Sequence, residues 1–165
     1  MDDTDFDEFV RARWPKLVRS AILLGCSPTE AEDVVQAALT RCLVNWTKVV
    51  GAHDIDAYVH RILINSFTSS RRRLWVREQP TTDLEAPASE DMTERVERSD
   101  ALLRSLRKLG SDQRAVVVLR YYVQLNEQQT AAVLGVPVGT VKSRLSRALS
   151  ALACDPALAE MKGTQ

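Results

Sequence analysis

The residues best suited to chemistry lie near the C-terminus, in residues 126–149, which read NEQQTAAVLGVPVGTVKSRLSRAL. Asn126 and Gln129 are spaced as a helix capping box, Gly135 stands at an expected turn, and Pro137 takes an expected first helical position. The helix that follows has one apolar face, formed by Val141, Leu145, Ala148, Leu149 and Leu152. Its opposite face carries Lys142, Ser143, Ser146 and Arg147. This pattern predicts a helix-turn-helix, whose second helix enters the major groove of duplex DNA.

A second row of candidate binding residues lies in a helix predicted from about Asp54 to Arg73. At offsets 0, +3, +7, +10 and +14 the row comprises Tyr58, Arg61, Asn65, Thr68 and Arg72. An aromatic ring can stack on an exposed base, an amide can read a base edge, and arginine can neutralise a phosphate. The row therefore indicates contact with exposed bases, but the same spacing also fits a surface helix with a half-buried tyrosine.

A third candidate site is a polar stripe on an earlier helix, which begins at a capping box formed by Ser27 and Glu30. The core face of this helix is predicted to run from Ala31 to Trp46. The stripe on the opposite side comprises Asp33, Gln36, Ala37 and Thr40. Small and short polar side chains at this spacing suit docking of another helix, and they equally suit a face that is only solvated.

The elements that must position these residues are all predicted to be helical. A first helix starts near Phe6 and should kink or split at Pro15, and Ser111 is expected to cap a helix ahead of the helix-turn-helix. No period-two pattern suggests a strand. We therefore expect an all-α protein with two small helical domains, at residues 1–76 and 101–165.

The segment between the two domains, residues 77–100, is acidic, contains two prolines and is nearly devoid of apolar residues. It predicts a flexible or partly helical linker, which could span about 80 Å when extended. The net charge is zero, but it is distributed in blocks. Residues 11–76 and 101–165 are each basic, whereas residues 1–10 and 77–100 are acidic. This pattern indicates two modules that face polyanions and are joined by a solvated linker.

Several classes of protein are disfavoured by composition. The three cysteines, Cys26, Cys42 and Cys154, form no CxxC pair, and the two histidines have no ligand cluster around them, so we expect no disulfide framework, metal site or cofactor. No catalytic motif is visible, so binding is expected rather than enzymatic activity. No apolar run is long enough to span a membrane, and the acidic N-terminus does not resemble a secretion signal. A cytoplasmic protein is therefore expected.

Four segments, in this order, carry a family resemblance: SPTEAEDVVQAALTRCLVNW, DAYVHRILINSFTSSRRR, LGSDQRAVVVLRYY and PVGTVKSRLSRAL. Together they resemble the extracytoplasmic-function (group 4) sigma factors of bacterial RNA polymerase, in particular the SigE-type subfamily. The resemblance implies a first domain like sigma region 2, which docks on the polymerase clamp and opens the −10 element. It also implies a second domain like region 4, which reads the −35 element as duplex and contacts the polymerase flap.

The resemblance also implies roles for individual residues. The polymerase-binding helix would comprise Asp33, Val34, Gln36, Ala37 and Thr40. Single-stranded −10 DNA would be bound by Tyr58, Arg61, Asn65 and Arg72, with Asn65 at the position that recognises a flipped-out base. Duplex −35 DNA would be bound by Pro137, Lys142, Ser143, Arg144, Ser146 and Arg147. An anti-sigma factor is an implied regulator, although no residue here identifies one.

The sequence departs from the family pattern at three places. Tyr58 stands where many members have tryptophan, Leu109-Gly110-Ser111 replaces a frequent Leu-Pro helix start, and Ser146 replaces a larger residue. These differences affect which promoter sequence the protein would recognise, and they do not affect the family resemblance. Two other interpretations remain open: a polymerase-independent helix-turn-helix regulator that binds a palindrome as a dimer, and a helical partner-binding protein without DNA function.

Overall fold

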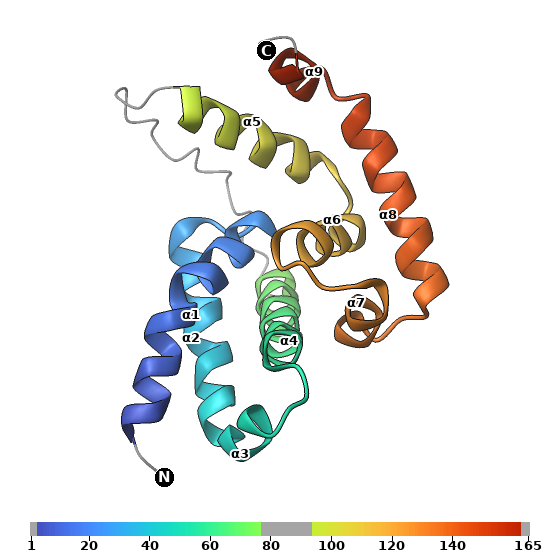
Figure 1. Cartoon of the computed structure of the whole chain (residues 1–165). Coiled ribbons are helices and arrows are strands. Elements are labelled where there is room, and N and C mark those ends of the chain that lie inside the picture. Colours follow the sequence, from blue (N-terminus) through green and yellow to red (C-terminus); the bar gives the residue numbers. More distant parts are fainter. Residues whose placement is uncertain (1–2, 77–93, 163–165) are drawn as a thin grey trace.

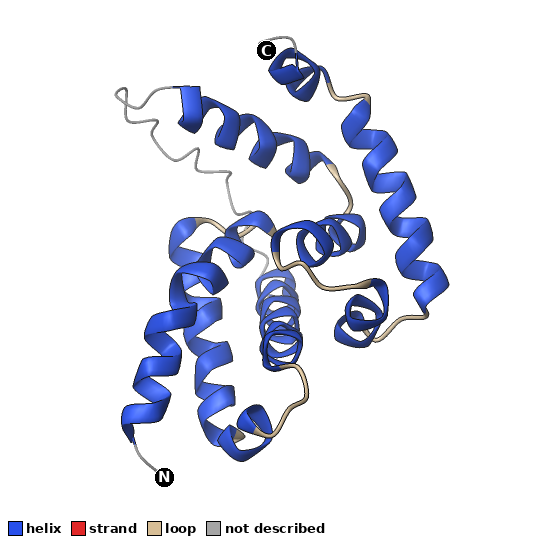
Figure 2. Ribbon diagram, viewed as in Figure 1, coloured by secondary structure: helices blue, strands red, loops and turns tan. Residues whose placement is uncertain are grey.

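The protein is described by a computed structural model that covers residues 3–76 and 94–162. Throughout these ranges it consists of helices and turns without strands, which confirms the all-α prediction (Figures 1 and 2). The first four helices are α1 (Asp3–Leu23), α2 (Pro28–Val44), α3 (Trp46–Val50) and α4 (Ile55–Val76). The remaining elements are α5 (Glu94–Lys108), α6 (Ser111–Val117), the π-helical turn η1 (Val118–Tyr122), α7 (Glu127–Leu134), α8 (Val138–Ala153) and α9 (Pro156–Lys162).

Local signals explain most of the helix boundaries in the first module, α1–α4. The predicted capping box at the start of α2 is confirmed: the Glu30 amide donates to Ser27 Oγ (3.2 Å), and the Ser27 amide donates to Glu30 Oε2 (2.8 Å). Of the two outcomes expected at Pro15, a kink or a split, the split does not occur, because α1 continues through Pro15 as one helix. The core-facing helix also ends earlier than predicted, since Asn45 separates α2 from the short α3, where Trp46 lies.

The first module has its own hydrophobic core, which α1, α2 and α4 share. Its fully buried members include Leu17, Val35, Cys42, Val59 and Leu63. At one end of this core Trp46 packs edge-on against two phenylalanines of α1, with centroid distances of 5.2 Å to Phe6 and 5.0 Å to Phe9. This core holds α2 and α4 side by side and so fixes the two candidate surfaces that they carry.

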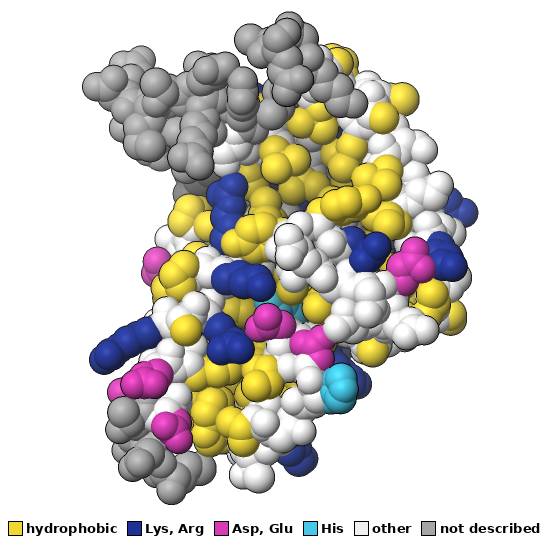
Figure 3. All heavy atoms as spheres, in the orientation of Figure 1, with side chains coloured by type: hydrophobic (Ala, Val, Ile, Leu, Met, Phe, Trp, Pro, Cys, Tyr) yellow, Lys and Arg dark blue, Asp and Glu magenta, His cyan; other side chains and the backbone are white. Residues whose placement is uncertain are grey.

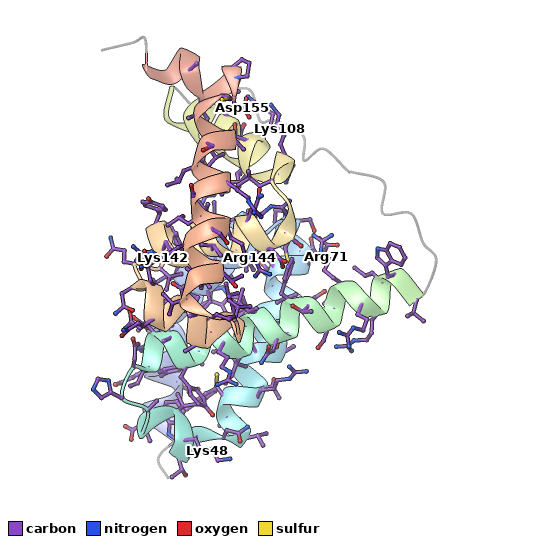
Figure 4. All side chains as sticks on the ribbon, turned by 90° about the vertical axis from the view of Figure 1, so that its right-hand side faces the viewer. Lys48, Arg71, Lys108, Lys142, Arg144 and Asp155 are labelled. Atoms are coloured by element: carbon purple, nitrogen blue, oxygen red, sulfur yellow. The ribbon has the colours of Figure 1, made fainter. Side chains whose placement is uncertain are left out.

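The second module, α5–α9, begins inside the segment expected to be a linker, because α5 starts at Glu94. Residues 77–93 of that expected linker lie outside the described residues. Ser111 is the first residue of α6 and Gly110 takes the cap position, so the prediction of a Ser111 cap was wrong. At the far end Asp155 caps α9 by accepting from the Ala157 amide (3.0 Å), and Lys108 of α5 donates to both of its carboxylate oxygens (3.1 and 3.0 Å; Figure 4). This ion pair ties α9 to α5.

The two modules pack against each other, with α6 and α7 beside α4 (Figure 1). Leu23 and Leu24 at the end of α1 share a buried cluster with the second module's Leu106, Leu109 and Val118. The two modules therefore pack together through a shared buried cluster, although the sequence predicted two separate domains. None of the described helices is both long and apolar enough to cross a lipid bilayer.

Candidate nucleic-acid and polymerase interface

Helix α8 presents the polar side chains that the helix-turn-helix pattern predicted. Val141 and Ala148 are buried against the second module, and this orients the opposite face outward. The outward residues Lys142, Ser143, Ser146 and Arg147 are all exposed, and Pro137 is exposed at the N-cap of the helix. Because Pro137 is the N-cap, it stands one position earlier than predicted. The exposed row is basic and uninterrupted by acidic residues, as an interface with duplex DNA requires.

The turn before α8 forms as its residues predict. The Gln129 amide donates to Asn126 Oδ1 (2.8 Å), and the Asn126 amide donates to Gln129 Oε1 (2.7 Å), so the capping box is confirmed. Gly135 ends α7 with φ +66°, a left-handed conformation that glycine adopts at little cost. These local contacts form the turn, and Val116 of α6 packs with Ala131 of α7 and Val141 of α8 beneath it.

Two cations of α8 are paired within the second module (Figure 4). Lys142 Nζ lies 3.6 Å from Glu127 Oε2 of α7, and both side chains are substantially exposed. Arg144 is half-buried, and its Nη2 lies 2.9 Å from Asp112 Oδ2 of α6. Arg144 therefore braces α8 against α6, and only part of its guanidinium is available to a phosphate.

The predicted −10 row lies along α4, but its members differ in exposure. Arg61, Asn65 and Arg72 are exposed, whereas Tyr58 is half-buried against the first core. Tyr58 and Arg61 line a crevice of about 350 Å³ whose other lining residues include Ala132 and Val133 of α7. The predicted −10 row thus faces the second module at its N-terminal end and solvent further along.

The predicted polymerase-binding stripe is a contiguous exposed surface of α2 with one exception. Asp33, Gln36, Ala37 and Thr40 are exposed. Val34 differs from the other members, because it is only 4% exposed and belongs to the first core, so it offers a partner only a small part of its side chain. Helical periodicity already placed Val34 on the apolar face, whereas the resemblance placed it among the contact residues.

Sequence reasoning missed a groove of about 290 Å³ that adjoins this stripe between α2 and α4. Its polar lining comes from Asp33, Arg41, Ser66, Ser70 and Arg73. Arg41 Nη1 donates to Ser66 Oγ across the groove (3.3 Å). The signal available in the sequence was Arg41 itself, which stands eight residues after Asp33 and so continues the same helical stripe.

A broad apolar area faces solvent on the second module between α5 and α8 (Figure 3). Leu102 of α5 and Leu149 of α8 are among the exposed large apolar residues of the molecule. Leu149 belongs to the apolar face that periodicity predicted for α8, and the structure leaves that end of the face partly exposed. An apolar surface of this kind is typical of a protein contact.

The titratable groups of the described residues offer no catalytic arrangement. Burial raises the pKa of the Cys26 and Cys42 thiols to about 11, so both thiols stay protonated and unreactive. Burial lowers the pKa of His60, which is held in the first core. Within the described part of the chain no three His, Cys, Asp or Glu side chains are grouped so as to hold a metal ion.

Comparisons with known proteins agree with this geometry. Residues 99–152 match the family described as "Sigma-70, region 4". The RNA polymerase sigma-E factor of Streptomyces coelicolor is 40% identical over 148 residues, which cover 90% of this chain and 84% of the relative. The ECF RNA polymerase sigma factor SigM of Mycobacterium tuberculosis is 34% identical over 154 residues, which cover 90% of this chain and 75% of the relative.

A solved structure adds support at the level of the fold. The sigma factor RpoE from Bartonella quintana, crystallised with the anti-sigma factor NepR, superimposes with a TM-score of 0.68 and 29% identity, covering 90% of this chain and 94% of that one. These relatives are all named as sigma factors, two of them as sigma factors of RNA polymerase, so the interpretation as a polymerase-independent regulator is not favoured. The chain belongs to the extracytoplasmic-function sigma factors of bacterial RNA polymerase.

Proposed function

We propose that this sigma factor divides promoter recognition between its two modules, and that it acts by binding rather than catalysis. In this scheme α8 reads the −35 element as duplex, while the exposed row on α4 captures unstacked bases of the −10 element. Capture of bases would offset the few kcal/mol needed to unstack each step. The observation that carries the proposal is that two exposed basic rows lie on two separate modules.

Two surfaces are proposed to contact core polymerase. The stripe of α2 with its adjoining groove would bind the clamp of core polymerase, and the apolar area between α5 and α8 would bind the flap. Since RpoE was crystallised with NepR, and CnrH was solved with the cytosolic domain of CnrY, an anti-sigma factor is a further proposed partner. The site of action would be the cytoplasm, where polymerase and promoter DNA are found.

The test is runoff transcription with purified core polymerase on candidate promoters of the source genome, run beside a duplex-binding assay. Arg147→Ala should weaken −35 duplex binding by about 5- to 100-fold, because it removes a contact in the major groove. Asn65→Ala should impair open-complex formation and spare duplex binding. Binding should also weaken steeply as salt is raised, since phosphate contacts release counterions.

Matched controls are Arg104→Ala, an exposed cation outside α8, and Thr47→Ala, an exposed polar residue outside the α4 row. Neither control should change either assay. If Arg147→Ala and Asn65→Ala lost both activities equally, the proposed division of labour would be contradicted.

A further inference from the structure

The C-terminal end of α4 extends beyond the core that holds the rest of the helix. The buried residues of α4 end at Ser66, but the helix continues from there to Val76. At 1.5 Å per residue this extension is about 15 Å long. In Figure 4 this end of α4 projects past the labelled Arg71, away from the neighbouring helices. The extension therefore presents side chains to solvent rather than to the first core.

An exposed tryptophan stands on this extension. Trp75 is 87% exposed, more than any other large apolar residue in the described ranges, and Val76 beside it is 79% exposed. The other two tryptophans of the chain, Trp14 and Trp46, pack against the first core. Exposing so large an apolar ring to water is unfavourable, and tryptophan is enriched on surfaces that make contacts. The position of Trp75 therefore indicates that a partner covers the ring.

Arginine side chains surround the ring and define the charge of its partner. Arg72 and Arg73 are both exposed, and Arg72 stands three residues before Trp75, so the two side chains are neighbours on the helix surface. Arg71 is engaged within the first module, because its Nη2 donates to the Gly25 carbonyl (2.6 Å). This contact holds the extension in place. The end of α4 is thus cationic and aromatic, which suits a partner with anionic groups and flat apolar faces.

A DNA strand has this chemistry, and Trp75 lies where the strand on α4 would continue. Phosphates are anionic, and every base has a flat face on which an aromatic ring can stack. Trp75 follows Arg72 by three residues, as Arg61 follows Tyr58, so it extends the predicted −10 row by one step. Trp75 lies about 15 Å beyond Asn65 along the helix, which is about four nucleotides of 3.4 Å each. One strand can therefore contact both residues.

The surface proposed for core polymerase lies on the other side of α4. The groove that adjoins the α2 stripe is lined from α4 by Ser66, Ser70, Arg73 and Leu74, and Trp75 does not belong to this lining. Trp75 comes nine residues after Ser66, which is about two and a half turns of helix. The ring therefore points away from the groove, and the helical phase favours DNA over polymerase as its partner.

From these observations we propose that Trp75 stacks on a DNA base at the boundary between melted and duplex promoter DNA, with Arg72 on a neighbouring phosphate. This inference rests on the proposed assignment of α4 to the −10 element. When the strands separate, the last intact base pair is left with one uncovered face. An indole ring on that face replaces part of the stacking that melting removes. Asn65 then holds an unstacked base, and Trp75 holds the edge of the melted region open.

The first experiment measures the half-life of heparin-resistant open complexes, formed by the full chain and core polymerase on a promoter found by runoff transcription. Trp75→Ala should shorten this half-life by about 5- to 100-fold, the range expected for loss of one base–aromatic stack. Trp75→Phe should retain most of the half-life, whereas Trp75→Leu should behave like Trp75→Ala, because leucine is apolar but has no ring. The matched control, Val44→Ala, removes a 79% exposed apolar residue of α2 and should change nothing.

A second measurement identifies the base. Abasic nucleotides are placed one at a time through the −10 element and its flanks, and the wild type and Trp75→Ala are compared on each fragment. At the position of the stacked base, the abasic nucleotide should shorten the half-life for the wild type and have no further effect on Trp75→Ala. The two changes remove the same contact, so their effects should not add. Effects that add at every position would overturn the inference.

Two controls test other partners for the ring. Weaker binding of Trp75→Ala to core polymerase in the absence of DNA would overturn the inference, because the ring would then contact protein. Iodide should quench tryptophan fluorescence more in the free wild type than in Trp75→Phe, since Trp75 is the exposed ring. Equal quenching would mean that the chain covers its own Trp75, and would overturn the inference as well.

The outcomes also separate this inference from the proposed function. If the wild type forms no open complexes with core polymerase, the proposed function fails and this inference fails with it. If Asn65→Ala impairs open complexes while every Trp75 variant matches the wild type, only the role of Trp75 is overturned. Normal binding of −35 duplex by the Trp75 variants would show that they are folded.

Discussion

His60 is a buried imidazole whose hydrogen bonds define its protonation state. Its Nδ1 lies 2.8 Å from the Asp56 carbonyl and its Nε2 lies 3.2 Å from Ser20 Oγ of α1. A carbonyl only accepts, so Nδ1 carries the proton and Nε2 accepts from the serine hydroxyl. Only 2% of the residue is exposed, and burial lowers its pKa below the usual 6.5. The neutral ring is therefore the form that the first core accommodates.

Because the folded-state pKa is lowered, His60 should make stability depend on pH in one direction. The contribution of His60 to the free energy of unfolding is complete above pH 6.5. It is lost as the pH falls from 6.5 toward the pKa of the folded state, because the unfolded chain binds the proton first. Urea unfolding at pH 7.5 and at pH 5.5 should show that the wild type loses more free energy of unfolding between these two pH values than His60→Gln does. The exposed His53 supplies the control, because His53→Gln should keep the wild-type loss. Equal losses in all three proteins would rule out His60 as the source.

At the scale of elements, two glycines end helices for different physical reasons. Gly135 ends α7 with φ +66° and open space around it, whereas Gly25 follows α1 with φ +116°. A methyl group on Gly25 would collide with Arg114 Nη1. That guanidinium is held by carbonyls of both modules, so it cannot move aside without losing hydrogen bonds.

We therefore expect unequal costs from the same substitution at the two helix ends. Gly135→Ala should destabilise the protein by about 1 kcal/mol, the usual penalty for a left-handed alanine. Gly25→Ala should cost about 3 kcal/mol, because backbone strain and the displaced Arg114 add together. Urea unfolding of both variants measures the difference. Equal costs would show that the Arg114 contact contributes little.

At the scale of the whole molecule, the shared cluster should couple the stability of the two modules. Leu24 is 3% exposed and packs with leucines of the second module, whereas Leu39 lies in the first core alone. Leu24→Ala should cost about 3 kcal/mol by leaving a cavity. Hydrogen exchange should then accelerate in both modules, because both lose a common support.

Leu39→Ala is the matched control for this coupling. It removes the same side chain from a core that the second module does not share, so exchange should accelerate mainly in α1, α2 and α4. The same exchange pattern in the two variants would mean that the modules are not coupled through Leu24.

The sequence by itself determined the features that depend on neighbouring residues. The capping boxes at Ser27 and Asn126, the turn at Gly135 and the exposed row of α8 were all predictable, because capping, left-handed glycine and helical periodicity act within a few residues. The family followed from four motifs in order. The same local reasoning left two outcomes open at Pro15, and the structure shows that α1 does not split there.

Only the tertiary structure decided what depends on distant residues. It left Leu149 partly exposed, formed the groove between Arg41 and Arg73, and packed the two modules together. The contact from Gln129 to Asp54 spans 75 residues, and that from Arg114 to Leu24 spans 90. No spacing rule links residues so far apart, because their meeting depends on how complete helices pack. The sequence therefore predicted the two rows of candidate residues, and the tertiary structure determined how far each row is exposed.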